Sequence, residues 1–149
     1  MTRRRVVVLA SGGGSTLQAL LDAAADPSYG VTVAAVGSDR ESAGALDRAR
    51  TAGVPTFCLP LDGDRGAWDA QLAATVGSYE PDLVVSAGFM RLVGQAFLER
   101  YAGRLVNSHP SLLPAFPGMH AARDALAYGV QVTGCTLFVV DGGVDSGPI

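Results

Sequence analysis

The sequence contains no lysine, and all eleven basic residues among its 149 are arginines. This absence excludes Schiff-base catalysis by lysine and the lysine of a Walker-type phosphate loop. Histidine and cysteine are scarce as well: the chain has only His109 and His120, and Cys58 and Cys135 lie far apart without the spacing of metal ligands. We therefore expect no metal site and two reduced thiols.

Positive net charge and long apolar runs are also missing. The formal net charge is −3, which argues against nonspecific binding of nucleic acid. The apolar run VVVLA at residues 6–10 is shorter than the hydrophobic region of a signal peptide. No other run approaches the roughly 18 residues of a membrane span. These features predict a cytoplasmic protein that acts on small molecules.

Short β-branched segments alternate with longer segments of helical periodicity, and this alternation predicts an α/β fold. The strands are so continuously apolar that both faces of their sheet should be covered. We expect one Rossmann-like, doubly wound, mostly parallel sheet with helices on both faces. The expected strands are residues 5–10, 31–38, 56–61, 82–88, 104–109 and 132–140, and the expected helices are residues 15–25, 42–52, 66–79, 94–101 and 120–128.

The segment SGGGST at residues 11–16 lies between the first expected strand and the first expected helix. Glycines let a backbone approach its ligand, and the free N–H groups of a helix start favour an anion such as phosphate. Ser15 and Gln18 have capping-box spacing, so Ser15 is expected to cap the helix. The alternative is a tight turn that binds nothing. Leu17 replaces the third glycine of the dinucleotide fingerprint, which disfavours a dehydrogenase using Asp39 for the ribose.

A second candidate segment, SAGFMRLV at residues 86–93, ends the fourth expected strand. Ligands of open α/β sheets bind at such strand ends, so Phe89, Met90 and Leu92 could line a slot for a flat heterocycle. The alternative is that these apolar side chains pack in the core and that Arg91 is simply solvated.

The segment RLVNSHPSLLPAFPG at residues 104–118 runs an apolar strand into a loop stiffened by three prolines. Asn107 and His109 lie two positions apart on the strand, so their side chains project from the same face. An imidazole can deliver or accept a proton near neutral pH, and an amide N–H suits a developing oxyanion. This pair indicates acyl or formyl transfer.

The glycine-rich segment VVDGGVDSGPI at residues 139–149 carries Asp141 and Asp145. If its strand lies beside the one bearing His109, Asp145 could reach the imidazole, favour its charged form and orient it. The alternative is that both aspartates are turn residues. His120 stands where a helix should begin, and a structural or capping role is favoured over catalysis.

Taken together, SGGGSTLQALLDA, AGFMRLV, YAGRLVNSHPSLLPAFPG and GVDSGPI resemble the phosphoribosylglycinamide formyltransferase family of folate-dependent enzymes. The resemblance implies transfer of a formyl group from 10-formyltetrahydrofolate, a co-substrate, to the amine of glycinamide ribonucleotide in purine biosynthesis. It implies direct attack through a tetrahedral intermediate without a metal. The alternatives are a formyltetrahydrofolate deformylase and a noncatalytic folate- or nucleotide-binding module. Reduced folate and the ribonucleotide would be the partners, with neither nucleic acid nor membrane, and a homodimer is compatible with the family.

The same resemblance implies roles for individual residues. Asn107, His109 and Asp145 match the catalytic trio, in which Asn107 would hydrogen-bond the formyl oxygen and His109 would donate a proton. Substrate binding would involve Gly14, Ser15 and Thr16, and folate binding would involve Arg65, Met90, Arg91, Leu92, Val93, Asn107, Asp141, Gly142, Gly143 and Val144.

The chain departs from the family pattern at three points. Thr16 replaces an asparagine that contacts substrate in the family, and Phe138 stands where a histidine is common. The chain ends at Ile149, whereas family members continue, so residues 1–149 are expected to form a single formyltransferase domain truncated at its C-terminus.

Overall fold

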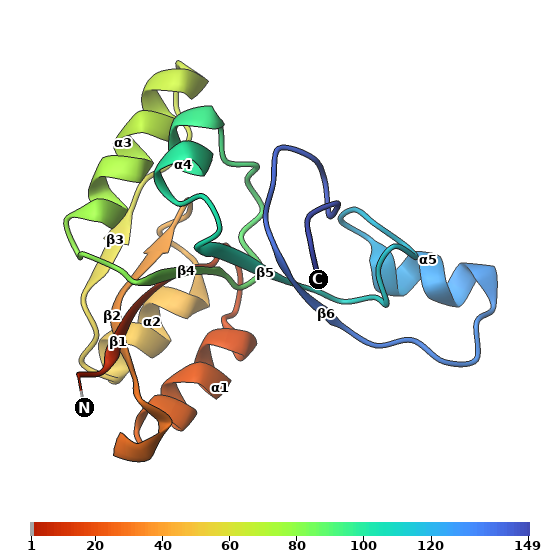
Figure 1. The fold of residues 1–149 in the computed structure, drawn as a ribbon, viewed down its shortest axis with the longest axis horizontal. Coiled ribbons are helices and arrows are strands. Elements are labelled where there is room, and N and C mark those ends of the chain that lie inside the picture. Colours follow the sequence, from red (N-terminus) through yellow and green to blue (C-terminus); the bar gives the residue numbers. More distant parts are fainter. Residues whose placement is uncertain (1) are drawn as a thin grey trace.

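The protein is built around one six-stranded sheet, seen in a computed structural model that describes residues 2–149 (Figure 1). The strand order is β3-β2-β1-β4-β5-β6, and every neighbouring pair is parallel except β5 and β6. The strands are β1 (Arg4–Leu9), β2 (Val31–Ser38), β3 (Thr56–Cys58), β4 (Leu83–Ser86), β5 (Leu105–His109) and β6 (Thr136–Val139). The helices are α1 (Ser15–Ala24), α2 (Gly44–Thr51), α3 (Arg65–Gly77), α4 (Gln95–Arg100) and α5 (Ala121–Tyr128), with a 3-10 turn η1 at Pro27–Tyr29.

Helices cover both faces of the sheet because its strands are apolar on both sides. Val6 and Val8 of β1 pack in one cluster with buried residues of α1 and α2. Val7 and Leu9, which project to the opposite face, pack in a second cluster with α3 and α4. The predicted doubly wound, mostly parallel α/β fold is therefore confirmed. None of the helices within residues 2–149 is long and apolar enough to cross a membrane.

The last strand differs from its predicted length. Residues 132–140 were expected to be extended, but β6 covers only Thr136–Val139 and runs antiparallel to β5. Thr136 lies opposite His109, the last residue of β5. Since β5 ends there, the residues before Thr136 have no strand to pair with.

The start of α1 also differs from the prediction. Gly14, not Ser15, is the N-cap residue, and no side chain caps this helix. Gly14 has a positive φ of 75°, and a Cβ atom there would lie 2.7 Å from the Cα atom of Ala45. The Gln18 side chain donates to Asp22 and accepts from Arg48. The expected capping box is therefore wrong, because the close approach of α2 requires glycine at the position that begins the helix.

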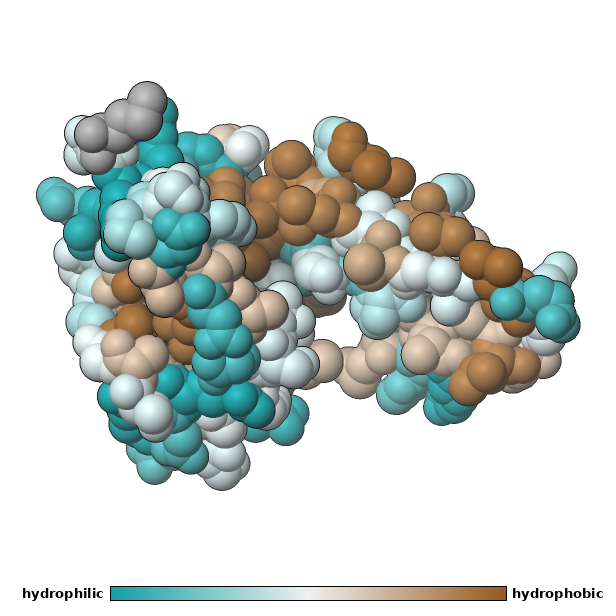
Figure 2. Space-filling view, turned by 90° about the horizontal axis from the view of Figure 1, so that it is seen from below, coloured by the Kyte–Doolittle hydropathy of each residue, from teal (hydrophilic) through white to brown (hydrophobic). Residues whose placement is uncertain are grey.

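Between β5 and β6 the chain extends from the edge of the sheet as an arm that carries α5 (Figure 1). The Thr136 hydroxyl accepts a hydrogen bond from the Leu113 N–H (3.0 Å) and donates one to the Ser111 carbonyl (2.7 Å), which ties the proline loop to β6. The space-filling view shows apolar surface along this arm (Figure 2). Leu126 and Tyr128 of α5 are among the exposed apolar residues.

A buried carboxylate fixes α4 against α3. Asp69, in the middle of α3, is 3% exposed and accepts hydrogen bonds from the backbone N–H groups of Gly94 and Phe97 at the start of α4. These N–H groups have no partner within their own helix, so the carboxylate takes the role of a capping side chain.

We predict that Asp69→Ala lowers the free energy of unfolding by about 3 kcal/mol, because it leaves one buried and one part-buried N–H donor unsatisfied. Urea denaturation measures this change. Asp47→Ala is the matched control, since the Asp47 side chain is 79% exposed and pairs only with Arg50; its effect should stay within about 0.5 kcal/mol. Equal losses in the two variants would contradict the proposed role of Asp69.

Candidate active site

A cavity of about 710 Å³ opens at the carboxyl ends of β4 and β5. Most of its lining comes from three segments: residues 88–93 after β4, residues 107–110 at the end of β5, and residues 138 and 140–145 on and after β6. The carboxyl ends of neighbouring parallel strands lie at one edge of a sheet, which is where open α/β sheets bind ligands. Asn107, His109 and Asp145 all line this cavity.

His109 is 4% exposed, and both of its ring nitrogens face oxygen atoms. Nδ1 lies 3.3 Å from Oδ2 of Asp145, and Nε2 lies 2.8 Å from the carbonyl oxygen of Phe116. A carbonyl oxygen can only accept, so Nε2 is the donor in that hydrogen bond. The imidazolium form has an N–H for each of the two oxygens, whereas a neutral ring with its proton on Nε2 has none for Asp145. Both ring nitrogens therefore face oxygen acceptors, and these contacts orient the ring.

Asp145 connects the two loops on either side of the imidazole. Its Oδ2 atom, besides facing His109, accepts a hydrogen bond of 2.7 Å from the N–H of Gly118 in the proline loop. Asp141, in contrast, bonds within its own turn, where Oδ1 accepts from the Gly143 N–H and the Ser146 hydroxyl, both at 2.9 Å. The alternative that both aspartates are turn residues thus describes Asp141 but not Asp145.

Asn107 lies in the middle of β5, between Ser86 of β4 and Phe138 of β6. It is half-buried and lines the cavity two residues before His109, as the strand periodicity predicted. Phe138 is 3% exposed and also lines the cavity, so an apolar ring stands directly across the ladder from the amide.

The segment after β4 forms an apolar wall of the cavity. Met90 and Leu92 are 49% and 59% exposed, so they are not core residues, and a heterocycle slot describes them better than core packing does. Phe89, however, stacks on Trp68 with ring centroids 6.4 Å apart, so core packing describes this residue. Arg65 supports the wall from α3, because its Nη2 donates to the Leu92 carbonyl at 2.7 Å.

Gly14, Ser15 and Thr16 do not line the cavity around His109. Ser15 and Thr16 are exposed at the start of α1. The glycine loop nevertheless touches the cavity wall, since the Ser11 N–H donates to the Gly88 carbonyl at 3.0 Å.

Sequence reasoning missed the role of Asp39, whose side chain is fully buried. Its Oδ1 accepts from the Ser11 hydroxyl (2.5 Å) and its Oδ2 from Nε of Arg91 (2.6 Å). Burial raises the pKa of Asp39, but these two hydrogen bonds outweigh it, and the pKa lies below its usual value. The side chain is out of reach of a ligand because it is fully buried behind these donors, so the dehydrogenase alternative, in which Asp39 binds a ribose, is wrong. Arg91 is likewise not simply solvated.

His120 precedes α5 and is exposed, and its side chain makes no capping hydrogen bond. Its carbonyl oxygen accepts from the Asp124 N–H in the first turn of the helix. Residues 2–149 contain no group of three or more histidine, cysteine or acidic side chains placed to hold a metal ion.

The fold and this site define a class of group-transfer enzyme. The family model described as formyl transferase matches residues 4–149, and the chain belongs to that family. Phosphoribosylglycinamide formyltransferase of Mycobacterium tuberculosis is 56% identical over 147 residues, which are 97% of this chain and 67% of the relative. The enzyme of that name from Escherichia coli is 45% identical and is covered over 69% of its length.

A solved structure shows the same fold. The crystal structure of glycinamide ribonucleotide transformylase 1 from Symbiobacterium toebii superposes with a TM-score of 0.95 at 47% identity. The match covers 99% of this chain and 70% of that one. These comparisons confirm the family predicted from the NSHPSLLP and glycine-rich segments.

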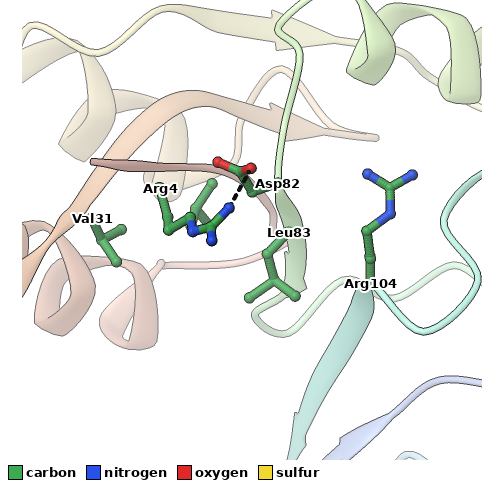
Figure 3. Close-up of a pocket in the computed structure, with 6 residues that line it drawn as sticks. Arg4, Val31, Asp82, Leu83 and Arg104 are labelled. Atoms are coloured by element: carbon green, nitrogen blue, oxygen red, sulfur yellow. Dashed lines mark hydrogen bonds and ion pairs between the residues drawn. The ribbon is translucent and has the colours of Figure 1, made fainter. Parts of the chain in front are cut away.

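A second hollow lies at the opposite, amino-terminal end of the strands and is lined by Arg4, Asp82 and Arg104, among others (Figure 3). Its charged groups already have protein partners. Arg4 pairs with Asp82 at 3.2 Å, and Arg104 donates to the carbonyl oxygens of Pro81 and Arg100. The backbone N–H of Arg5 also donates to Asp82, at 2.7 Å, and holds the pKa of this carboxyl below its usual value. These contacts thus stabilise the fold at the amino-terminal end of the strands.

The lowered pKa of Asp82 predicts a pH-dependent contribution to stability. A carboxyl whose pKa is lower in the folded chain stabilises the fold above the unfolded value of about 3.9, and this contribution is lost as pH falls through the folded pKa. Asp82→Asn should therefore unfold at a lower urea concentration than the wild type at pH 7. The difference between the two midpoints should shrink at acidic pH; a constant difference would contradict the argument.

Proposed function

We propose that the chain transfers a formyl group from 10-formyltetrahydrofolate to the amine of glycinamide ribonucleotide, the reaction of purine biosynthesis named for its relatives. The observation that carries the proposal is the buried His109–Asp145 pair beside Asn107 in a cavity with an apolar wall. A proton donor next to an uncharged N–H donor is what a developing tetrahedral oxyanion requires.

The proposed roles follow from the atoms that face the cavity. The substrate amine attacks the formyl carbon, whose oxygen then carries the developing negative charge. Asn107 donates its amide N–H to that oxygen, and His109, oriented by Asp145, stabilises it and serves as the proton donor. The bond from the formyl carbon to the folate nitrogen then breaks. His109 gives its proton to the leaving folate nitrogen and regains one from the amine that has attacked, so the protons balance. The formyl carbon bonds in turn to the folate nitrogen and to the substrate amine, and never to an enzyme atom.

The cavity suits a flat heterocycle with a polar edge. Met90, Leu92 and Val144 contribute exposed apolar side chains, while the loop of Asp141 and Gly143 offers backbone groups. Arg65 also lines the cavity, and its Nη2 donates to the Leu92 carbonyl. Its positive charge could pair with an anionic tail of the folate. Small-molecule sites of this kind combine apolar walls with a few placed polar groups.

The ribonucleotide phosphate is proposed to bind at the glycine loop. Gly14 turns the chain into α1, and Ser15 and Thr16, whose N–H groups begin that helix, are exposed residues. A helix N-terminus with free N–H groups favours a phosphate. The loop is joined to the cavity wall by the hydrogen bond from the Ser11 N–H to Gly88, so the two substrates would bind at adjacent places.

Transfer is tested by following the folate absorbance change with both substrates present. We expect formylated ribonucleotide to appear at the rate at which tetrahydrofolate forms. Formate release without any amine acceptor would instead identify a deformylase. Folate binding measured by calorimetry, with neither product formed, would identify a noncatalytic binding module.

Replacing the proposed proton donor should affect turnover much more than binding. We expect His109→Asn to lower kcat by roughly 10²- to 10⁴-fold, the usual contribution of a positioned acid or base, with a folate KM close to that of the wild type. Asp145→Asn should shift kcat in the same direction. His120→Asn is the matched control, because this second histidine is exposed and outside the cavity, and it should keep wild-type kcat. A parallel rise in folate KM for His109→Asn would point to a structural role.

A further inference from the structure

Three loops from neighbouring strands meet at one buried carboxylate. Asp39 follows β2, Ser11 follows β1, and Arg91 follows β4. The Ser11 hydroxyl donates to Oδ1 of Asp39 at 2.5 Å, and Nε of Arg91 donates to Oδ2 at 2.6 Å. The Ser11 oxygen in turn accepts the backbone N–H of Met90 at 2.8 Å. The Asp39 carboxylate is thus connected to the cavity wall twice: directly to Arg91, and through the Ser11 hydroxyl to the backbone of Met90.

The Asp39 carboxylate is buried, and each of its two oxygens accepts a hydrogen bond. The Asp39 side chain is 0% exposed, and a buried charge of this kind is costly unless it has a cation and hydrogen-bond donors next to it. Arg91 supplies the cation and lines the cavity with its side chain 36% exposed. Arg40 also approaches the carboxylate, but at 3.8 Å and from solvent.

The glycine loop has supports besides Asp39, whereas the contacts of Met90 and Arg91 in the wall lead to Asp39. The Gly12 carbonyl accepts from the Ala45 N–H (3.0 Å), and the Gly13 carbonyl accepts from Nε of Arg48 (2.7 Å), so α2 holds this part of the glycine loop without Asp39. In the wall, the Met90 N–H donates to the Ser11 hydroxyl, and Nε of Arg91 donates to Asp39.

We propose that Asp39 is a positioning residue for the folate side of the site: through Arg91, and through Ser11 to the backbone of Met90, it fixes the wall formed by residues 88–93. The inference rests on the proposed function only for the identity of the ligand. Asp39 itself does not line the cavity, so its effect on the reaction is exerted through these neighbours.

The test uses Asp39→Asn, which keeps an acceptor for Ser11 but places a neutral amide against Arg91. A hydrogen bond between charged groups contributes enough for at least about a tenfold change. We expect the folate KM to rise by about tenfold, with the ribonucleotide KM and kcat each within about threefold of the wild type. Equal changes in both KM values, or no change, would overturn the proposal.

A binding measurement provides a readout besides activity. Trp68 is the only tryptophan of the sequence and stacks on Phe89 of the wall, so its fluorescence reports on residues 88–93. Titration with tetrahydrofolate should give a dissociation constant about tenfold higher for Asp39→Asn than for the wild type. Arg40→Ala is the matched control, because it removes the exposed, more distant partner of the same carboxylate; it should bind tetrahydrofolate like the wild type.

The proposed route is tested in the Arg91→Ala background. Adding Asp39→Asn there should change the folate KM less than twofold, since the contact that it disrupts is already absent. A full effect in that background would overturn the route through Arg91.

If Asp39→Asn does not fold, Ser11→Ala tests the second route. This variant leaves the Asp39–Arg91 pair in place and frees the Met90 N–H, and it should also raise the folate KM selectively.

The two proposals fail differently. A wild-type chain that neither binds tetrahydrofolate nor transfers a formyl group contradicts the proposed function. A wild-type chain that transfers the group, together with an Asp39→Asn variant of unchanged folate KM, contradicts only the role of Asp39.

Discussion

One carboxylate oxygen joins the segments that make the site. Oδ2 of Asp145 accepts the Gly118 N–H of the proline loop and faces Nδ1 of His109. The proline loop in turn directs the Phe116 carbonyl at Nε2 of the same ring. The imidazole is thus held from both sides by two loops that are held to each other. Removing the carboxylate would leave Nδ1 of His109 and the Gly118 N–H without this partner, so ring orientation and loop packing both depend on the same atom.

The direction of β6 makes this contact difficult to reach. Because β6 is antiparallel to β5, the chain passes His109 at Thr136 and then moves away from it, ending the strand opposite Val106. It must turn back to bring Asp145 to the ring. The return is close: a Cβ atom at Gly147 would lie 1.8 Å from the Val139 carbonyl oxygen, and the Val139 N–H donates to Pro148. Glycine at position 147 therefore serves a steric purpose.

The sequence predicted the elements well because their signals are local. Apolar strands and amphipathic helices repeat at fixed periods, so their existence and approximate bounds can be inferred without knowing what they pack against. The pairing of Asn107 with His109 is equally local, since it follows from strand alternation. What depended on distant neighbours was missed or misjudged. The cap of α1 is set by the approach of Ala45, and the length of β6 is set by where β5 ends.

Asp39 shows the same limit for a site residue. In the sequence it is an acidic residue after a strand, a pattern that also fits a ribose ligand, and nothing nearby identifies Ser11 and Arg91 as its partners. The choice of arginine over lysine at position 91 has a physical meaning here. An arginine can donate through Nε to Asp39 and still present the rest of its guanidinium group elsewhere, whereas a lysine ammonium is a single point charge. A cation that must both neutralise a buried carboxylate and line a cavity is better supplied by arginine, and Arg91 occupies that position.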